Sequence, residues 1–198
     1  MIAGRHGARQ RDRFDPKRAA QLDDPARFDY LPPRELFGLL DVPRGATMLD
    51  FGTGTGTYAM ELARSRPDVA IIAFDEQRRM LDMLRQKLSV TPMPNIKPLL
   101  ADKKGFASLC AQADRILALN VLHELGDEAL GRMSALLAPG GRILFVDWSA
   151  GVKRPVGPPP DHVYSPAEAV KRLRAFNLKV LRKRIFRYHY ALTCGISS

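Results

Sequence analysis

The 198-residue sequence lacks the features that mark secreted, membrane-spanning and zinc-dependent proteins. No apolar run approaches the ~20 residues that a membrane-spanning helix needs. The basic N-terminus has no apolar segment, which excludes a secretory signal, and Asp12 and Asp15 argue against a mitochondrial presequence. The two cysteines, Cys110 and Cys194, form no CxxC pair, and HELGD at residues 123–127 is not HExxH. We therefore expect a cytoplasmic protein with no membrane span, no disulfide framework and no bound metal.

Acidic residues are scarce in the C-terminal quarter, which concentrates the net charge of +10 there. Residues 151–198 contain 10 Lys/Arg and 2 Asp/Glu, whereas residues 35–150 contain 13 and 14. A cationic surface favours anionic partners, nucleic acid among them. The same charge is also typical of a solvated surface in an arginine-rich proteome, so the composition leaves both interpretations open.

Prolines and glycines divide the N-terminal part of the chain. Residues 1–13 are rich in glycine and arginine and are predicted to form a disordered basic tail. Residues 14–44 have the pattern of short helices that prolines interrupt. Pro33 suits the first turn of a helix that runs to about Leu40.

From residue 45 onwards, short apolar strands alternate with amphipathic helices, which is typical of a parallel sheet covered on both faces. Strands are expected at residues 46–51, 69–74, 95–100, 115–120 and 142–148. Helices are expected at residues 55–66, 76–88, 127–141 and 165–176. The last of these begins with a capping box formed by Ser165 and Glu168, with Pro166 in the first turn. Residues 178–194 alternate in the manner of a β-hairpin that closes the sheet.

The stretch MLDFGTGTGTYAMELAR, residues 48–64, has three glycines at alternate positions between a predicted strand and a predicted helix. Such a loop lies at the carboxyl end of a parallel sheet, where these folds bind ligands. GTGTYA, residues 54–59, formally matches the dinucleotide pattern GxGxxG/A, so a NAD-dependent oxidoreductase is one interpretation. Asp50 argues against it, because a carboxylate there repels a pyrophosphate and attracts the cation of a methionine-derived cofactor.

Asp75 ends the next predicted strand, 21 residues after Gly54. A carboxylate at this position accepts hydrogen bonds from the ribose hydroxyls of an adenosine. Together with the DxGxGxG loop of residues 50–56, it favours an adenosine cofactor that has a positively charged end. The residues of this set are Asp50, Gly52, Gly54, Gly56 and Asp75.

With these motifs the sequence resembles the class I S-adenosylmethionine-dependent methyltransferases. LDFGTGTG is similar to their first motif, IIAFDEQRRML to the second, and ADRILALNVLHEL and LLAPGGRILFVDW to those of the fourth and fifth strands. The resemblance covers residues 27–194 and is greatest to small enzymes related to the ubiquinone/menaquinone-biosynthesis methyltransferases. It implies an α/β fold, a Rossmann-like doubly wound seven-stranded sheet in the order 3-2-1-4-5-7-6 with the last strand antiparallel. Residues 45–198 would form this domain, and residues 14–44 an N-terminal helical lid.

The resemblance also assigns roles to individual residues, with S-adenosylmethionine as the implied cofactor. Gly52, Thr53 and Gly54 would contact its methionine moiety, and Asp75 its ribose. Other residues implied around the adenine and the sulfonium end are Glu76, Met80, Asp102 and Asn120. Tyr30 would approach the cofactor from the lid. The segment after Asp102 departs from the family pattern, because it is short and basic.

Methyl transfer from a sulfonium is an in-line displacement, so the protein has mainly to align the acceptor and exclude water. A general base is required only where the acceptor must lose a proton. Of the four histidines, His123 follows the fourth predicted strand and is the best candidate for that catalytic base. A helix-capping or supporting histidine is the alternative role. Candidates for the acceptor pocket are Tyr30, Trp148, His162 and Tyr164, for which plain aromatic packing is the alternative.

The sequence favours a small-molecule acceptor and leaves its identity, the methylated atom and the oligomeric state open. The (D/N)PP(Y/F) element typical of methylation of nucleic-acid amines is absent after the fourth strand, where the chain reads LNVLHEL. RNA stays an alternative acceptor, because residues 171–187 contain eight Lys/Arg. A further alternative is a non-catalytic protein that uses a cofactor-binding fold as an interaction platform.

Overall fold

The computed structural model describes residues 14–109 and 112–197. Its strands are β1 (Thr47–Phe51), β2 (Ala70–Asp75), β3 (Ile96–Leu100), β4 (Ala113–Leu119), β5 (Leu137–Trp148), β6 (Leu178–Ile185) and β7 (His189–Ile196). Its α-helices are α1 (Arg27–Tyr30), α2 (Pro33–Leu40), α3 (Thr57–Ser65), α4 (Arg78–Val90), α5 (Lys103–Ser108), α6 (Asp127–Leu136) and α7 (Pro166–Arg174), and its 3-10 helices are η1 (Pro16–Leu22) and η2 (Pro160–His162). None of these described helices is long and apolar enough to cross a membrane. The disordered tail predicted for residues 1–13 lies outside the described residues.

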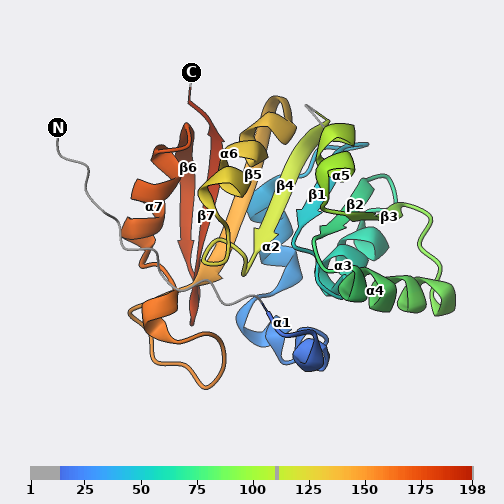
Figure 1. The fold of residues 1–198 in the computed structure, drawn as a ribbon, viewed down its shortest axis with the longest axis horizontal. Helices are drawn as coiled ribbons and strands as arrows, with labels where there is room; N and C mark the ends of the chain where they lie inside the picture. Colours follow the sequence, from blue (N-terminus) through green and yellow to red (C-terminus); the bar gives the residue numbers. More distant parts are fainter. Residues whose placement is uncertain (1–13, 110–111, 198) are drawn as a thin grey trace.

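The seven strands form one sheet in the order β3-β2-β1-β4-β5-β7-β6 (Figure 1). β7 runs antiparallel to β5 and β6, and the other paired strands are parallel. This arrangement confirms the predicted Rossmann-like, doubly wound sheet with an antiparallel last strand. The central strands are apolar along most of their length, as in residues 116–119 of β4, because helices cover both of their faces.

Two apolar cores lie on opposite faces of the sheet. Helices α2, α3 and α4 contribute Leu36, Leu62 and Leu84 to one core. Helices α6 and α7 contribute Met133 and Leu173 to the other core. Packing on both faces fixes where each strand ends, and the carboxyl ends of the parallel strands carry the residues of the candidate site.

Local sequence signals account for the edges of the sheet. Pro98 lies in β3, an edge strand that pairs with β2 alone, where a missing N–H is tolerated. α7 begins with the predicted capping box, in which Ser165 and Glu168 each accept a hydrogen bond from the other's backbone N–H. Residues 178–196 form the predicted hairpin. The boundary after α6 differs from the prediction, because Leu137 already pairs with Ala113 and begins β5.

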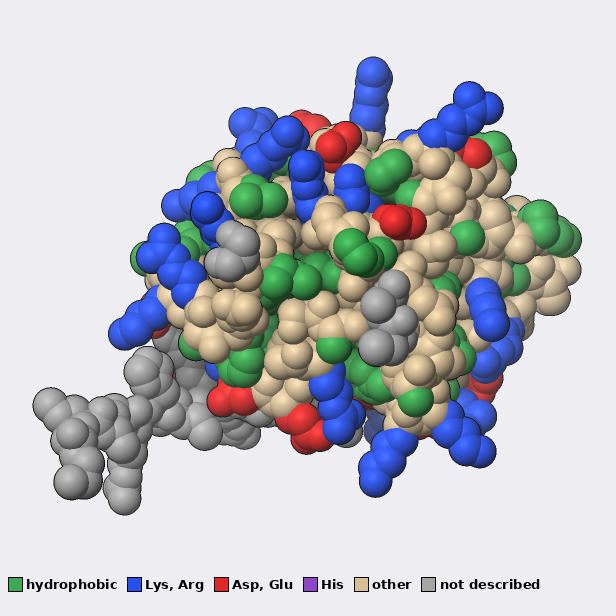
Figure 2. Space-filling model, turned by 90° about the horizontal axis from the view of Figure 1, so that it is seen from above, with side chains coloured by type: hydrophobic (Ala, Val, Ile, Leu, Met, Phe, Trp, Pro, Cys, Tyr) green, Lys and Arg blue, Asp and Glu red, His purple; other side chains and the backbone are tan. Residues whose placement is uncertain are grey.

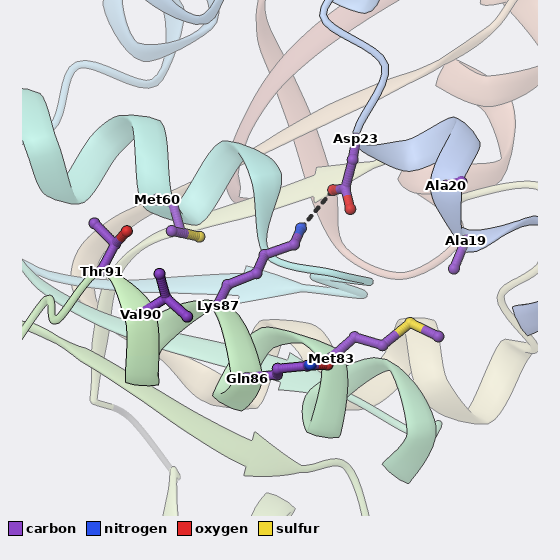
Figure 3. A pocket seen from close by; sticks show the side chains of 9 residues that line it. All are labelled: Ala19, Ala20, Asp23, Met60, Met83, Gln86, Lys87, Val90 and Thr91. Carbon is purple, nitrogen blue, oxygen red and sulfur yellow. Dashed lines mark hydrogen bonds and ion pairs between the residues drawn. The ribbon is translucent and has the colours of Figure 1, made fainter.

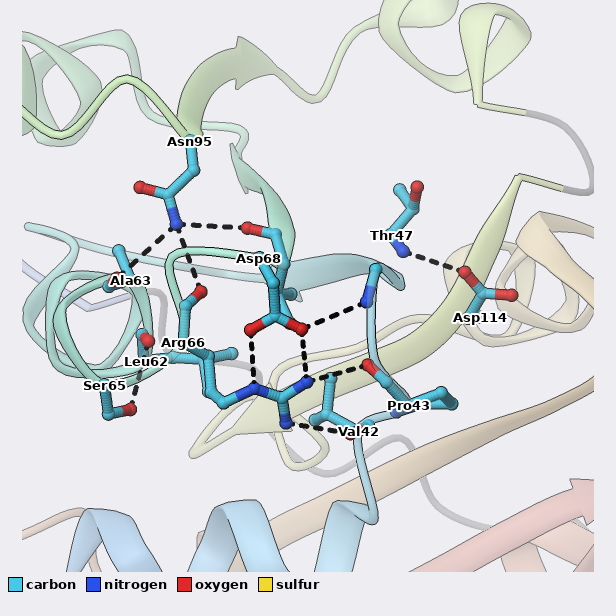
Figure 4. Close-up of polar contacts among 12 residues, drawn as sticks. Val42, Pro43, Thr47, Leu62, Ala63, Ser65, Arg66, Asp68, Asn95 and Asp114 are labelled. Carbon is cyan, nitrogen blue, oxygen red and sulfur yellow. Dashed lines mark hydrogen bonds and ion pairs between the residues drawn. The ribbon is translucent and has the colours of Figure 1, made fainter.

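Polar contacts tie together the loops at the amino end of the sheet (Figure 4). Arg66 donates hydrogen bonds to both carboxylate oxygens of Asp68 at 2.8 Å, and to the carbonyl oxygens of Val42 and Pro43 at 3.0 Å. The Asn95 amide donates to three carbonyl groups in and after α3, the shortest at 3.1 Å. These contacts stabilise the scaffold at the end opposite the carboxyl ends of the parallel strands.

Candidate cofactor and acceptor site

A cavity of about 1020 Å³ lies at the carboxyl ends of β1, β2, β4 and β5. Residues 50–54 and 74–77 line one part of it, residues 119–126 another, and the N-terminal segment of residues 14–30 contributes to its wall. Parallel α/β sheets bind ligands at this edge. Seven Asp/Glu and two Arg line the cavity, so a chain with a net positive charge has an acidic cavity.

The glycine loop between β1 and α3 has a backbone conformation that favours glycine. Gly52 has a φ of 74° and Gly54 a φ of 55°, both in the left-handed region. A Cβ on Gly52 would lie 2.4 Å from Cγ1 of Val121, and one on Gly54 2.8 Å from Cδ1 of Leu22. Both glycines line the cavity, so the loop presents bare backbone to a ligand.

Two carboxylates flank this loop. Asp75 ends β2 and accepts hydrogen bonds from the backbone N–H groups of Gly54 and Gln77, both at 2.8 Å. Asp50, in β1, is 3% exposed and accepts a hydrogen bond from the hydroxyl of Thr53 at 2.6 Å. Burial raises the pKa of Asp50 to about 6 and also raises the pKa of Asp75, although hydrogen bonds oppose the rise at both groups. A ligand cation beside Asp50 would therefore stabilise its ionised form.

His123 and Asp147 form a buried pair at the carboxyl ends of β4 and β5. The carboxylate of Asp147 is 2.8 Å from Nδ1 of His123 and accepts the backbone N–H of His123 at 2.9 Å. It also accepts the backbone N–H of Trp148 at 2.7 Å. Burial alone would lower the pKa of His123, but the charge and hydrogen bond of Asp147 outweigh it and raise this pKa. His123 lines the cavity, with Nε2 3.6 Å from Oε1 of Glu124.

Aromatic rings pack beside this pair. The rings of Trp148 and His189 have centroids 3.9 Å apart, and Tyr30 lies parallel to His189 at 5.7 Å. Tyr188 meets Tyr30 edge-on at 5.6 Å. His189 is fully buried, and within the part of the chain that the structure describes neither of its ring nitrogens has a hydrogen-bond partner. Burial lowers the pKa of His189 to about 3, so the ring is neutral.

Comparison with known proteins shows which domain the chain resembles. Residues 48–141 match the sequence profile of a methyltransferase domain. The crystal structure of a SAM dependent methyltransferase from Aquifex aeolicus superposes with a TM-score of 0.86 and 26% identity, over 93% of this chain and 100% of that one. Residues 48–141, a little under half of the chain, are thus similar to a methyltransferase domain, and the chain as a whole has the fold of a solved S-adenosylmethionine-dependent methyltransferase.

Curated relatives match this chain over about half of the chain's length. Acetylserotonin O-methyltransferase of Rattus norvegicus is 31% identical over 111 residues, which are 54% of this chain and 25% of the relative. Demethylmenaquinone methyltransferase of Deinococcus radiodurans is 30% identical over 103 residues, 51% of this chain and 42% of the relative. The matched part of the chain thus spans well under two thirds of either relative, and the similarity lies in one shared domain.

The residues of the cavity fit S-adenosylmethionine, the cofactor of the solved methyltransferase that the chain resembles. Gly52 and Gly54 present only backbone to the cavity, because Val121 and Leu22 pack where their Cβ atoms would lie. Asp50 is available for an ammonium group and Asp75 for ribose hydroxyls. Asn120 adds an open acceptor, since its buried Oδ1 has no hydrogen-bond partner among the described residues. A polar atom buried without a partner is costly, and a ligand donor would satisfy it.

The cavity brings together most of the residues that the sequence nominated. Those that line it are Tyr30, Asp50, Gly52, Thr53, Gly54, Asp75, Glu76, Met80, Asn120, His123 and Trp148. Most of them lie together because the fold brings the carboxyl ends of the parallel strands to one edge of the sheet. The role of each residue stays a prediction.

Four nominated residues lie elsewhere, for local reasons. Asp102 is exposed and caps α5, where its Oδ1 accepts the backbone N–H of Gly105 at 2.8 Å. Gly56 has a φ of 80° and begins α3, with the space of its missing Cβ filled by a leucine of α4. Tyr164 packs against the apolar core and under the guanidinium of Arg172, 5.4 Å from the ring centroid. His162 ends η2 outside the lining of the cavity.

Sequence reasoning also missed residues of the site. One of them is Asp147, the partner of His123. In the sequence only its place near the end of an apolar strand could have indicated a role in the site. Arg27 and Tyr58 line the cavity from α1 and α3, and no motif identifies them. Among residues 14–109 and 112–197, no group of three or more His, Cys, Asp or Glu is arranged to hold a metal ion.

The neutral, unpartnered ring of His189 makes stability depend on pH. A histidine whose pKa falls from about 6.5 in the unfolded chain stabilises the fold fully above that pH and loses this contribution as the pH falls. At pH 5 the loss is about 2 kcal/mol. Between pH 7.5 and pH 5, the free energy of unfolding of the parent protein should therefore fall by about 2 kcal/mol more than that of His189→Phe. Urea unfolding of both proteins at both pH values measures this difference. An equal difference at the two pH values would contradict this expectation.

Proposed function

We propose that this chain transfers the methyl group of S-adenosylmethionine to a small-molecule acceptor, and that His123 takes a proton from the acceptor. The buried His123–Asp147 pair carries this proposal, because the cavity exposes a histidine whose orientation a carboxylate fixes from behind. Such a pair is the usual form of a general base in enzymes. When bound, S-adenosylmethionine supplies an activated methyl group, so the protein has no further electrophile to provide.

Asp147 determines what His123 can do. Its carboxylate, 2.8 Å from Nδ1, holds the proton of the neutral imidazole on that nitrogen and leaves Nε2 free to accept. A proton taken from the acceptor then resides on Nε2, and the negative charge of Asp147 stabilises the resulting imidazolium. Because Asp147 is fully buried, water does not screen this stabilisation.

The remaining residues of the cavity bind and orient the two substrates in this proposal. Asp50 accepts from the ammonium group of the cofactor and Asp75 from its ribose, while Gly52, Thr53 and Gly54 provide bare backbone. Glu76 and Met80 flank the adenine, and Asn120 lies at the sulfonium end. Residues 14–44 act as a lid that excludes water, and Tyr30 and Trp148 form the wall for the acceptor.

The acidic lining of the cavity supports a neutral or cationic acceptor. Besides Asp50 and Asp75, Glu124 and Glu128 line it, and burial raises the pKa of Glu124 to about 7. Together with the aromatic wall, this favours a flat acceptor with an ionisable hydroxyl group. The O-methyltransferase among the relatives, which acts on acetylserotonin, agrees with an oxygen acceptor.

RNA is a second candidate acceptor, and the charge of one sheet edge favours it. β6 exposes the basic side chains Lys179, Arg182, Lys183 and Arg184. Figure 2 shows Lys and Arg side chains gathered on the side of the molecule that carries β6 and α7, at the left of the view. The acidic cavity weighs against this candidate, because it repels a phosphate backbone.

A labelling experiment separates these candidates. The purified protein is first titrated with S-adenosylmethionine, S-adenosylhomocysteine and NAD, and then incubated with methyl-labelled S-adenosylmethionine and a cell extract divided into small-molecule and RNA fractions. We expect binding of the first two ligands and label in the small-molecule fraction, absent with His123→Gln. Label in RNA, with binding that weakens steeply from 50 to 200 mM salt, would favour the second candidate. Cofactor binding without any transfer would indicate a non-catalytic protein, and binding of NAD alone would refute the proposal.

A further inference from the structure

Arg27 is held at the glycine loop by contacts within the N-terminal segment. It is the first residue of α1, and its guanidinium lies over the ring of Tyr58 at 5.2 Å. Its Nη1 donates a hydrogen bond at 2.5 Å to the carbonyl oxygen of Leu22. The same carbonyl accepts the hydroxyl of Thr57 at 3.0 Å. Since Thr57 and Tyr58 begin α3, these contacts place the guanidinium beside the first turn of that helix.

The guanidinium of Arg27 has no ion-pair partner among the described residues, although its charge acts on the nearby Asp50 and opposes the rise of that carboxyl's pKa. The residue lines an acidic cavity. Arg27 uses one guanidinium nitrogen for Leu22, and the fork has further donors. An unpaired guanidinium at a ligand cavity is suited to a carboxylate or phosphate, which it binds through two parallel hydrogen bonds.

The start of α3 favours the same kind of ligand. The N-cap of this helix is Gly56, and no side chain caps its first N–H groups. The free N–H groups and the helix dipole attract an anion. Asp50, on the other side of the loop, is a buried carboxylate that attracts a cation. The cavity therefore offers a positive and a negative group near the glycine loop, which matches the two charges of an α-amino acid.

We propose that Arg27 binds the carboxylate of the methionine moiety of S-adenosylmethionine, opposite the ammonium group that Asp50 binds. This inference rests on the proposed function, since it concerns the same cofactor. It assigns to the N-terminal segment a direct role in cofactor binding, in addition to covering the cavity. A carboxylate on the acceptor would have the same chemistry, and the ligands of the test below separate the two sources.

Further contacts join this segment to the glycine loop and to α4. Asp23 accepts hydrogen bonds from the hydroxyls of Thr55 and Thr57, both at 2.6 Å, and from Nζ of Lys87 at 2.5 Å. Figure 3 shows Lys87 reaching Asp23 across a second, smaller cavity between η1 and α4. A cofactor bound to Arg27 would thus contact a segment that is itself hydrogen-bonded to the glycine loop through Asp23. Its binding should protect the N-terminal segment from proteolysis.

Two ligands that differ by one group test the assignment. Decarboxylated S-adenosylmethionine keeps the ammonium, sulfonium and adenosine groups and lacks only the carboxylate. We expect Arg27→Gln to weaken S-adenosylmethionine binding by about 10- to 100-fold in calorimetry and to leave binding of the decarboxylated ligand unchanged. Arg27→Lys should retain part of the affinity, and Arg34→Gln, on the exposed surface of α2, should retain all of it.

The outcomes distinguish failure of this inference from failure of the proposed function. If the parent protein binds neither ligand, the proposed cofactor is wrong. If it binds S-adenosylmethionine and Arg27→Gln leaves that affinity unchanged, Arg27 does not bind the cofactor carboxylate, and a carboxylate on the acceptor becomes the alternative. An equal loss for both ligands would indicate a structural effect and would also overturn the inference. Circular dichroism checks that each variant is folded.

Discussion

Asp75→Ala is expected to abolish measurable binding of S-adenosylmethionine and S-adenosylhomocysteine. The carboxylate of Asp75 accepts the backbone N–H groups of Gly54 and Gln77, both at 2.8 Å, so it positions the glycine loop against the end of β2. In the proposed complex it also accepts the ribose hydroxyls. Hydrogen bonds to a charged group contribute about 1.5–3 kcal/mol each, so the loss of two corresponds to at least about 100-fold in affinity. Isothermal titration calorimetry of the purified variant measures the loss.

Two further variants separate the two roles of Asp75. Asp75→Asn keeps the shape of the side chain and one acceptor oxygen, and should bind more weakly than the parent protein but better than Asp75→Ala. Asp68→Asn removes a carboxylate that Arg66 holds at the amino end of the sheet, and should leave affinity unchanged. A dissociation constant for Asp75→Ala within threefold of the parent value would show that the ribose is bound elsewhere.

Asp147→Asn should lower turnover by about 100- to 10,000-fold, which is the usual contribution of a positioned general base. Cofactor affinity should stay unchanged. The amide cannot hold the proton of His123 on Nδ1 and stabilise the imidazolium as the carboxylate does. Removing the negative charge also lowers the pKa of His123, which Asp147 raises. Because the base must be neutral, the rate rises with pH through this pKa, and the variant should shift the rise to lower pH. The acceptor found by labelling provides the assay.

The pair is further tested by combining substitutions. His123→Gln should cost as much as Asp147→Asn, and the double variant little more than either, because the two residues act as one unit. Glu128→Gln is the matched control, since Glu128 lines the same cavity and its carboxylate pairs with Arg132. Additive losses, or an unshifted pH profile for Asp147→Asn, would show that Asp147 supports the fold and not the base.

Most strands and helices could be predicted from the sequence because their signals are local and repeated. Each parallel strand is a short apolar run, and each helix has one apolar stripe. The order of the seven strands was not read from these signals, and the resemblance to a known family implied it. Pro98 did not disturb the prediction, since an edge strand tolerates it. The start of β5 at Leu137 was missed because it depends on pairing with Ala113, a contact that has no local signal.

The candidate site was predictable where position in a strand decides location. Asp50, Asp75 and His123 lie at or beside strand ends, and parallel strands bring those ends to one edge. Side-chain direction was not predictable, and Asp102 therefore caps a helix instead of lining the cavity. Arg27 could not be found either, because its place depends on how an irregular, proline-interrupted segment packs against α3.

Trp148 is the one tryptophan of the chain, and it lies in the cavity wall with the ring of His189 at 3.9 Å and the guanidinium of Arg154 at 5.4 Å. Indole emission from this protein therefore originates at a single location. Its spectrum and intensity report on the polarity and contacts of that wall and on nothing else in the fold. A library of hydroxylated aromatic compounds can be screened against unlabelled protein by following that fluorescence, with no knowledge of the product and no isotope.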